Sequence, residues 1–306
     1  MNRSVAILMA IRNGQEYIPQ QLNSFIEQSY TNWSLFVSDD GSSDTSAEIV
    51  KQFFLSYPEI DGYIKKGPCK GFCENFQSMI NDCNIISDYY AFSDQDDIWL
   101  PDKLTRATKY LNSIPSNIPA LYCSVTTLID ENNRVIGQSL IPTKNLDFAN
   151  ALLHNIASGN TMVFNQCARE LLMSASSQDM VVHDWTLYQI VTACGGEVYY
   201  DNEPTVLYRQ HANNVIGDGR NILFRAKNFL DSFSTNKKEW NDRNEKVLKN
   251  VTEKFTDKAL QTYMDFYKIK KSGFFARLFY FKRSGVYHQY TLGTLSTLIY
   301  VCFGKM

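Results

Sequence analysis

The first 111 residues of this 306-residue chain alternate between short apolar runs and segments whose apolar residues recur at helical spacing. Val5–Ile11 and Tyr89–Ser93 are the clearest runs, and they are typical of strands buried on both faces of a sheet. Leu35–Ser38 is a third such run, and Gly62–Lys65 is a weaker strand candidate. Strands and helices that alternate at this spacing pair in parallel, so the pattern predicts an α/β fold with a mainly parallel sheet.

The pattern loosens after residue 111 and changes again after residue 219. A length of 306 residues fits one large catalytic domain with an appendage. We therefore expect a catalytic domain at 1–219, with halves at 1–111 and 112–219, and a basic helical region at 220–306. Within the second half we expect strands at 121–129, 156–164, 197–200 and 205–208, and helices at 168–173 and 185–193.

Charge is distributed unevenly along the chain. The net formal charge is −2, but residues 1–219 carry −12 and residues 220–306 carry +10. Such asymmetry indicates that the basic region faces a nucleic acid or an anionic membrane. Because this region also carries many aromatic residues, we favour a membrane surface and expect no nucleic-acid partner.

The final 34 residues mix phenylalanine, tyrosine and leucine with arginine and lysine. The uncharged stretch from Gln289 to Gly304 contains several polar residues and is shorter than the ~18–20 apolar residues of a spanning helix. We expect a helix that lies in the membrane interface, and the alternative is a helical hairpin packed on the protein itself.

The cysteines and the N-terminus indicate a cellular compartment. Seven cysteines, an odd number, are scattered along a chain that is long enough to build its own core, which argues against a disulfide scaffold. The N-terminus leads directly into the strand-like run without the profile of a signal peptide. We therefore expect a cytoplasmic protein at the inner face of the cell membrane.

Acidic side chains gather directly after two of the predicted strands. The strand at 35–38 leads into the acidic segment 39–44, and the strand at 89–93 leads into Asp94-Gln95-Asp96-Asp97. In an open α/β sheet, the carboxyl ends of the strands form the ligand crevice. Three carboxylates within four residues repel one another unless a cation neutralises them, so the pattern favours a Mg²⁺ or Mn²⁺ site over a solvated turn.

Several segments together resemble the family 2 glycosyltransferases, which are inverting enzymes of the GT-A fold. These segments are Val5–Asn13, Val37–Asp44, Asp94–Leu104 and His183-Asp184-Trp185. The resemblance spans roughly residues 1–215 and implies a GT-A-like α/β sandwich with a mixed, mainly parallel sheet and a helical C-terminal extension. The DQDDIW segment and a late Tyr208–His211 segment are similar to the branch that builds bacterial capsule and O-antigen polysaccharides, many of whose members are rhamnosyltransferases.

The resemblance implies a nucleotide-sugar site at the strand ends. Asp40 matches the carboxylate that accepts a hydrogen bond from the base, and Arg12 stands where a tyrosine is common in the family. The other matching positions are Ala10 and Asn13, which contact the nucleoside, Gly71 and Asn75, which complete the base pocket, and Asp94, which lies near the ribose.

The metal and catalytic residues are also implied by the resemblance. Asp94 and Asp96 match the metal motif, and Asp184 matches the catalytic base. An ordinary N-cap at the helix that starts at Trp185 is the alternative for Asp184. His211 is a candidate third metal ligand and Arg209 a candidate charge clamp on the diphosphate; the alternative for the histidine is a structural role. No role is assigned to the other histidines.

These residues predict an inverting glycosyltransferase that uses a UDP- or dTDP-sugar and a glycan acceptor, which we expect to be lipid-linked. A carboxylate removes the proton of the acceptor hydroxyl, and a cation stabilises the departing diphosphate. One alternative is a sugar nucleotidyltransferase, although the segment Ile11–Gln15 offers only one arginine and one glycine for a triphosphate loop. The other alternative is a non-catalytic module that binds a glycan or a lipid.

Overall fold

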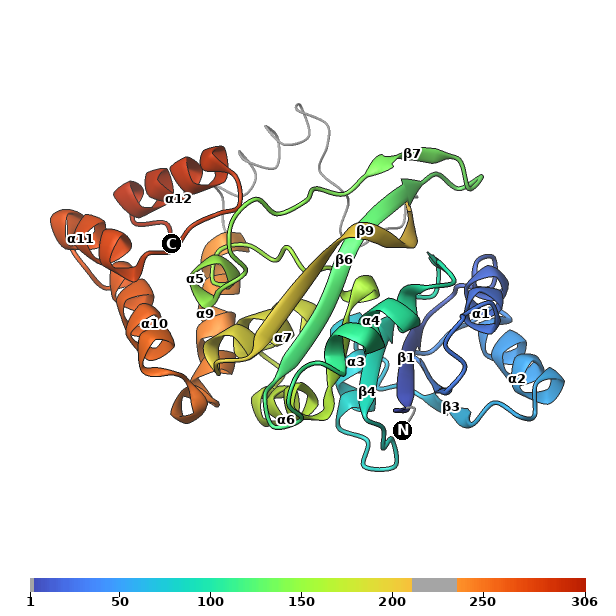
Figure 1. Ribbon diagram of the computed structural model, residues 1–306. Helices are drawn as coiled ribbons and strands as arrows, with labels where there is room; N and C mark the ends of the chain where they lie inside the picture. Colours follow the sequence, from blue (N-terminus) through green and yellow to red (C-terminus); the bar gives the residue numbers. More distant parts are fainter. Residues whose placement is uncertain (1–2, 211–235) are drawn as a thin grey trace.

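The structure is a computed structural model that describes residues 3–210 and 236–306 (Figure 1). Nine strands of this part of the chain form one sheet in the order β3-β2-β1-β4-β8-β6-β9-β5, and β7 pairs with β6. The strands are β1 (Val5–Ile11), β2 (Trp33–Asp39), β3 (Gly62–Lys66), β4 (Tyr89–Ser93), β5 (Ile98–Trp99), β6 (Ala120–Ile129), β7 (Val135–Gln138), β8 (Val163–Asn165) and β9 (Glu197–Arg209).

Strands β3, β2, β1 and β4 are all parallel. In this register Ile11 of β1 pairs with Asp39 of β2, and Met9 of β1 pairs with Ser93 of β4. The segments that follow these three strands therefore leave the sheet at the same edge. This geometry brings the two acidic segments of the sequence together.

The other half of the sheet is mixed. Strand β8 runs antiparallel to both β4 and β6, whereas β6 and β9 form a long parallel ladder with a register shift between Ser124 and Thr126. Strand β9 is continuous where the sequence predicted two strands, because it pairs with β6 on both sides of that shift. The predicted mixed sheet, with long parallel ladders, is confirmed.

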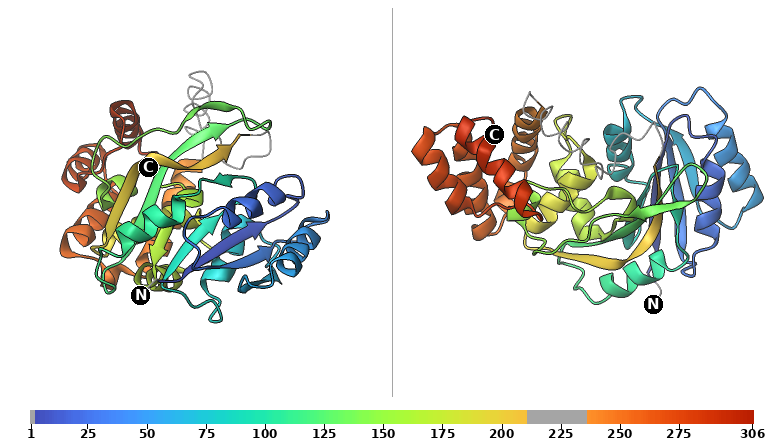
Figure 2. Two further views of the ribbon diagram at one scale, coloured as in Figure 1. Left: turned by 45° about the vertical axis from the view of Figure 1, so that its right-hand side comes forward. Right: turned by 90° about the horizontal axis from the view of Figure 1, so that it is seen from above.

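Helices cover both faces of the sheet (Figure 2). Val5, Ile7 and Met9 of β1 pack with the helices of one face, and Ala6 and Leu8 pack with those of the other. The first face carries α1 (Ile18–Ile26), α2 (Ser46–Ser56) and α4 (Lys103–Leu111), and the second carries α3 (Phe72–Ile80), α6 (Gln166–Ala175) and α7 (His183–Ala193).

One predicted strand, at 156–164, is wrong. This segment follows α5 (Phe148–Ala151) and contains the 3₁₀ turn η1 (Gly159–Thr161), so that β8 begins only at Val163. Asn160 explains the difference, because its side-chain amide donates to Asp97 and its carbonyl accepts from the Lys103 ammonium. These tertiary contacts hold the backbone at Asn160 in a turn instead of an extended conformation.

The C-terminal helices lie at the end of the molecule opposite β1–β3 (Figures 1 and 2). Val247, Phe266 and Tyr300 belong to the same apolar core as Leu187 of α7, so these helices pack on the protein. None of the helices among the described residues combines the length and the apolar character that a membrane span requires. The helices are α9 (Asn236–Lys249), α10 (Asp257–Lys270), α11 (Phe274–Ser284) and α12 (Thr291–Phe303), with a 3₁₀ turn η2 (Thr252–Lys254).

Candidate active site

A cleft of about 690 Å³ lies at the edge where β1, β2 and β4 end. We call it the donor cleft. Almost every predicted site residue lines it, although these residues come from distant parts of the sequence. The lining includes Ala10, Arg12, Asn13, Asp40, Gly71, Asn75, Asp94, Asp96 and Asp184.

Asp40 joins the loops that follow β2 and β3. Its side chain is 3% exposed, and its carboxylate accepts hydrogen bonds from the backbone N–H groups of Gly71 at 2.7 Å and Lys70 at 3.3 Å. Gly71 has a φ of +96°, which favours glycine at this position. Asp40 therefore shapes the wall of the donor cleft as well as facing it.

Asn75 and Gln95 fix two further walls. The Asn75 amide donates to Ser38 O at 2.8 Å, while its buried Oδ1 has no hydrogen-bond partner among the described residues. Gln95 accepts from the Arg12 N–H at 2.8 Å and donates to the Arg12 carbonyl at 3.0 Å. A Cβ on Gly14 would lie 2.4 Å from the Gln95 side-chain amide, so a larger residue here would displace that amide from Arg12.

The acidic segment after β4 divides into two parts. Asp94 and Asp96 face the donor cleft. Asp97 points inward, where its carboxylate accepts from the Asn160 amide at 2.7 Å and the Arg209 N–H at 3.2 Å. Burial, with help from the charges of Asp96 and then Asp184, raises the pKa of Asp94 to about 7. A proton or a cation near Asp94 is therefore favoured.

A buried lysine lies beside these carboxylates. Lys103 has no exposed surface, and its ammonium lies 3.8 Å from the centre of the Trp99 ring. Burial lowers the pKa of Lys103, whereas the charges of Asp97 and Asp94 raise it. The net effect is a pKa well below the ordinary value of lysine, and the Lys103 side chain does not line the cleft.

The donor set fits a hard divalent cation. Asp94 and Asp96 supply carboxylate oxygens, and Mg²⁺ is commonly held by one or two carboxylates together with substrate phosphates. The raised pKa of Asp94 agrees with the fit, because a bound cation would offset the cost of keeping this buried carboxylate ionised. Among the residues that the structure describes, no cluster of three or more His, Cys, Asp or Glu side chains forms a complete metal cage.

Asp184 lies in the first turn of α7, and the N-cap position falls on Val182. Its carboxylate accepts from the Asn155 amide at 3.0 Å, the Gly159 N–H at 2.8 Å and the Trp185 N–H. Burial raises the pKa of Asp184 to about 6, although these hydrogen bonds lower it. A carboxylate has about four acceptor sites, so one remains for a ligand hydroxyl.

Arg209 does not line the donor cleft. Its guanidinium lies over the Tyr17 ring and donates to Asp96 O at 2.9 Å and to the Gln20 side chain at 2.7 Å. Arg209 therefore holds the backbone of the loop that carries Asp96, and contact with a diphosphate stays a prediction. His211 lies outside the described residues.

The structure adds residues that the sequence pattern did not identify. Asn155 and Gly159 hold Asp184, and a Cβ on Gly159 would lie 3.1–3.3 Å from Asp184 and His183. His183 lines the cleft and stacks on Phe76, with ring centroids 4.0 Å apart. No motif marks Asn155 or Gly159, because their role depends on the turn at η1, whereas His183 belongs to the His183-Asp184-Trp185 segment but had no role assigned.

Comparisons with known proteins agree with this geometry. Residues 6–168 match the family described as glycosyl transferase family 2. The dTDP-rhamnosyl transferase RfbG of Shigella flexneri is 35% identical over 235 residues, which cover 72% of this chain and 76% of RfbG. The chain belongs to glycosyl transferase family 2.

Solved structures of glycosyltransferases share the fold of this family 2 enzyme. The TarS 1–349 structure from S. aureus with UDP-GlcNAc has a TM-score of 0.56 and 11% identity, and the match covers 99% of this chain and 88% of TarS 1–349. The mannosyltransferase PcManGT of Pyrobaculum calidifontis, with GDP-Man and Mn²⁺, has a TM-score of 0.51 and 14% identity, with 100% and 89% covered. The GT-A-type fold predicted from the sequence is confirmed.

Proposed function

We propose that this enzyme transfers a sugar from a nucleoside-diphosphate donor to a glycan hydroxyl with inversion at the anomeric carbon. The observation that carries the proposal is the position of Asp184 in the same cleft as Asp94 and Asp96. A carboxylate is thereby available to the acceptor while the two aspartates face the diphosphate. This arrangement supports a single in-line displacement without an enzyme nucleophile.

Asp184 acts as the general base in this proposal. Its pKa of about 6 keeps it ionised at neutral pH, yet close enough to the pH of the cell to accept a proton effectively. Asn155 and Gly159 fix the orientation of the carboxylate before the acceptor arrives. General-base catalysis of this kind contributes about 10²–10⁴-fold to the rate.

Asp94 and Asp96 would hold Mg²⁺ or Mn²⁺ together with the donor diphosphate. When bound, the cation supplies charge compensation for the diphosphate as it departs. A cation there would also offset the cost of burying the Asp94 carboxylate beside Asp96 and Asp184, which raises the pKa of Asp94. PcManGT, whose structure contains GDP-Man and Mn²⁺, is a precedent on the same fold.

The donor is proposed to be a dTDP-sugar, with rhamnose as the first sugar to test. The support is the 35% identity to a protein named as a dTDP-rhamnosyl transferase. A UDP-sugar is the second candidate, because TarS binds UDP-GlcNAc on the same fold. Asn75 Oδ1 and Asp40 offer acceptors for the N–H of a pyrimidine base, which both donors carry.

A thermal-shift assay with dTDP, UDP and GDP, each with and without Mn²⁺, tests the proposal. A ligand that binds only the folded protein raises its melting temperature. We expect the largest shift with dTDP and Mn²⁺, and in D96A we expect the Mn²⁺-dependent part to disappear. D102A is the matched control, since Asp102 is an exposed aspartate that does not line the cleft. A protein that no nucleotide stabilises would refute the proposal.

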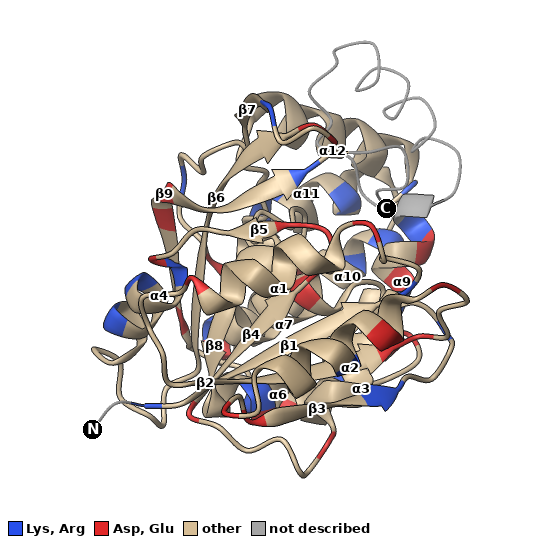
Figure 3. Cartoon of the chain, turned by 90° about the vertical axis from the view of Figure 1, so that its right-hand side faces the viewer, with Lys and Arg blue, Asp and Glu red and all other residues tan. Residues whose placement is uncertain are grey.

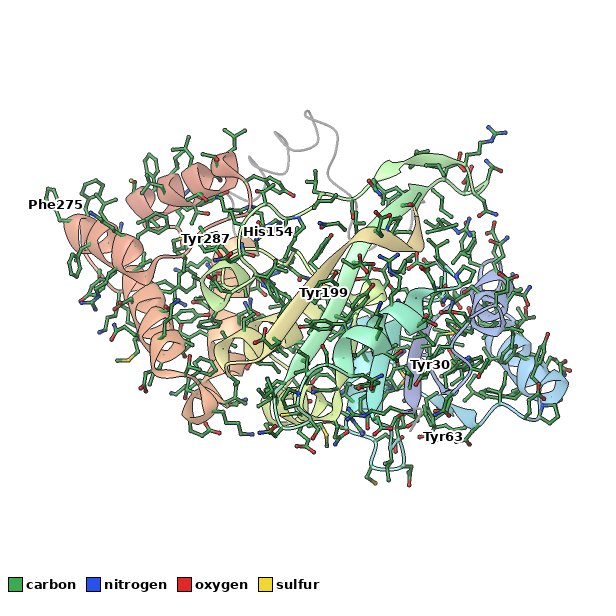
Figure 4. All side chains as sticks on the ribbon, viewed as in Figure 1. Tyr30, Tyr63, His154, Tyr199, Phe275 and Tyr287 are labelled. Carbon is green, nitrogen blue, oxygen red and sulfur yellow. The ribbon has the colours of Figure 1, made fainter. Side chains whose placement is uncertain are left out.

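The acceptor is proposed to be lipid-linked and to be met at a membrane surface. The outer sides of α11 and α12 expose large apolar side chains, including Phe275 at 84%, Leu292 at 80% and Phe303 at 69% (Figure 4 shows Phe275 at the far end of α11). We call this surface the C-terminal apolar patch; it consists of Phe274, Phe275, Phe279, Leu292, Leu295 and Phe303.

Basic residues accompany this patch. Lys271, Lys282 and Lys305 are exposed on the same helices or just beyond them, and Figure 3 shows lysine and arginine positions on α10 and α11. Apolar and basic side chains together suit the boundary of an anionic bilayer. The inner sides of these helices pack on the core. We therefore propose that the helices contact the membrane with their outer sides while they stay packed on the protein.

A further inference from the structure

A second cavity, of about 150 Å³, adjoins the donor cleft. We call it the side pocket. Ile156, Ser158 and Tyr208 line both the side pocket and the donor cleft, so the two spaces share a wall. A protein cavity of about 150 Å³ has been found to hold one six-membered ring. The side pocket therefore has room for one ring and not for an oligosaccharide.

The walls of the side pocket differ in chemistry from those of the donor cleft. Among the described residues they include no Asp, Glu, Lys or Arg, whereas the donor cleft contains several. Burial and the adjacent His288 lower the pKa of His154 to about 3, so this histidine is neutral as well. The polar and aromatic wall residues are Ser124, Thr126, Ser139, Ser158, His154, Tyr200, Tyr208 and Tyr290.

Two buried polar atoms in these walls lack a partner in the part of the chain that the structure describes. They are Thr126 Oγ1 and His154 Nδ1. Thr126 is 2% exposed, so water does not freely reach its hydroxyl. Buried polar groups are nearly always paired, and an unpaired one is costly. A ligand hydroxyl would satisfy such an atom once a small rotation of its side chain brings the atom to the pocket surface.

The shared wall connects the side pocket to the catalytic carboxylate. Asn155 and Gly159 donate hydrogen bonds to Asp184, and the residues between them include Ile156 and Ser158 of the pocket wall. A ring in the side pocket would therefore lie next to the segment that orients Asp184. To act as an acceptor, such a ring must present one hydroxyl to the donor cleft past Ile156, Ser158 or Tyr208.

The C-terminal tail supplies another wall. Tyr290 lines the pocket, and the preceding residue, Gln289, is clamped between Lys144 N at 2.9 Å and Asn150 Oδ1 at 3.0 Å. His288 stacks on His154 with ring centroids 3.8 Å apart. Figure 4 shows His154 beside Tyr287, between the C-terminal helices and the sheet. The turn from α11 to α12 is thus part of the pocket.

We propose that the side pocket is the acceptor subsite and that it binds one uncharged sugar ring, with the C-terminal turn as part of its wall. The inference rests on the proposed function. The acceptor hydroxyl gives its proton to Asp184 as its oxygen bonds to the anomeric carbon of the donor. The bond from that carbon to the diphosphate oxygen breaks, and the diphosphate leaves with the electron pair.

The test measures release of dTDP from dTDP-rhamnose in the presence of Mn²⁺ and increasing concentrations of neutral octyl glycosides of rhamnose, glucose and N-acetylglucosamine. An occupant of the pocket changes the rate in a saturable way, either by accepting the sugar or by excluding water. The T126V variant replaces the Thr126 hydroxyl with a methyl group of similar size. In this variant we expect the half-saturating glycoside concentration to rise about threefold to tenfold. The response to dTDP in the thermal-shift assay should remain.

T108V is the matched control. Thr108 is a buried threonine of α4 whose hydroxyl bonds to Leu104 O, and it lines neither cavity. It should leave the glycoside response unchanged. A second variant, S139F, fills the side pocket and should abolish the glycoside response while dTDP still binds.

Different outcomes separate the two proposals. A wild-type enzyme that binds neither dTDP nor UDP and releases neither from its nucleotide sugar would refute the proposed function. An enzyme that binds the nucleotide and releases it from the nucleotide sugar, but responds to none of the neutral glycosides or only to a charged comparison glycoside, octyl glucuronide, would overturn the acceptor subsite. An unchanged half-saturating concentration in T126V together with a normal response in S139F would overturn it too.

Discussion

The charged side chains of the donor cleft and those of the C-terminal helices lie in different environments. In the cleft, Asp94 and Asp184 have pKa values raised mainly by burial. On the C-terminal helices, charged groups have partners of opposite charge, as Lys270 does with Asp242 and Glu245 at 2.6 Å. A buried charge that lacks such a partner is costly. The difference indicates that the carboxylates of the cleft serve the reaction and not the stability of the fold.

The largest expected effect comes from removing the proposed base. D184N should lower kcat by about 10²–10⁴-fold, because the amide cannot take the proton of the acceptor. The shift in melting temperature with dTDP and Mn²⁺ should remain. D179N, which changes an aspartate that pairs with Lys246 on α9, is the control and should keep its activity. If D184N lost nucleotide binding and turnover together, Asp184 would be a structural residue.

The second expected effect is a pH dependence. The folded-state pKa of Asp184, about 6, lies above the ordinary value of 3.8. Protonation as the pH falls through 6 removes the base, so transfer should fall about tenfold per unit below pH 6 and level off above it. The measurement is kcat at saturating donor and Mn²⁺ from pH 5 to pH 9. A rate that stays constant down to pH 5 would contradict the assignment.

A smaller effect is expected from crowding the base. In G159A the new Cβ would lie 3.1–3.3 Å from Asp184 and His183, so Asp184 must shift by a few tenths of an ångström. Small displacements of catalytic groups are costly, and we expect kcat to fall about tenfold. G273A is the matched change on the C-terminal side, where a Cβ would meet nothing within 4 Å. Equal activity in G159A and G273A would contradict the prediction that crowding Asp184 slows the reaction.

The smallest effect on catalysis is expected in the C-terminal apolar patch. F275E should leave kcat with a water-soluble acceptor unchanged, because Phe275 is 84% exposed and lies far from the cleft. Binding to vesicles of anionic phospholipid should weaken, since one inserted phenylalanine contributes about 2 kcal/mol, or roughly thirtyfold. The measurement is co-flotation of the full-length protein with vesicles.

The control for F275E is L55E, which charges an equally exposed apolar residue on α2. It should bind vesicles like the unmodified protein. If the unmodified protein fails to float with the vesicles, or if both variants float equally well, the membrane proposal is wrong. Point variants suit this test better than truncation, because Tyr300 and Val301 of α12 are buried in the shared core.

Much of the first half of the fold could be predicted from local pattern. Apolar runs such as Val5–Ile11 become strands because a sheet covered on both faces needs apolar residues at every position. The acidic segments could be assigned to one edge because parallel strands end on the same side. Asp40 and Asp94 accordingly line one cleft, and Asp184 of α7, which was assigned from the family resemblance, lines it as well.

The parts that could not be predicted depend on contacts between distant residues. Asn155 and Gly159 carry no motif, and Lys103 had no role assigned within its segment; their contacts form because η1 passes between Asp97 and Asp184. The C-terminal region was ambiguous for a similar reason. Its mixture of aromatic and basic residues is compatible with a membrane surface or with packing, and the structure shows packed inner sides with an exposed apolar outer side.

The amino-acid sequence alone determined the alternation of strands and helices and the position of the carboxylates at strand ends, because both follow from short-range periodicity. The tertiary structure alone decided that Asp97 turns away from the cleft, that Arg209 holds the Asp96 loop, and that the tail contributes Tyr290 to a second pocket. These features depend on which distant backbone groups are available to pair with a buried side chain. That information exists only once the chain has folded.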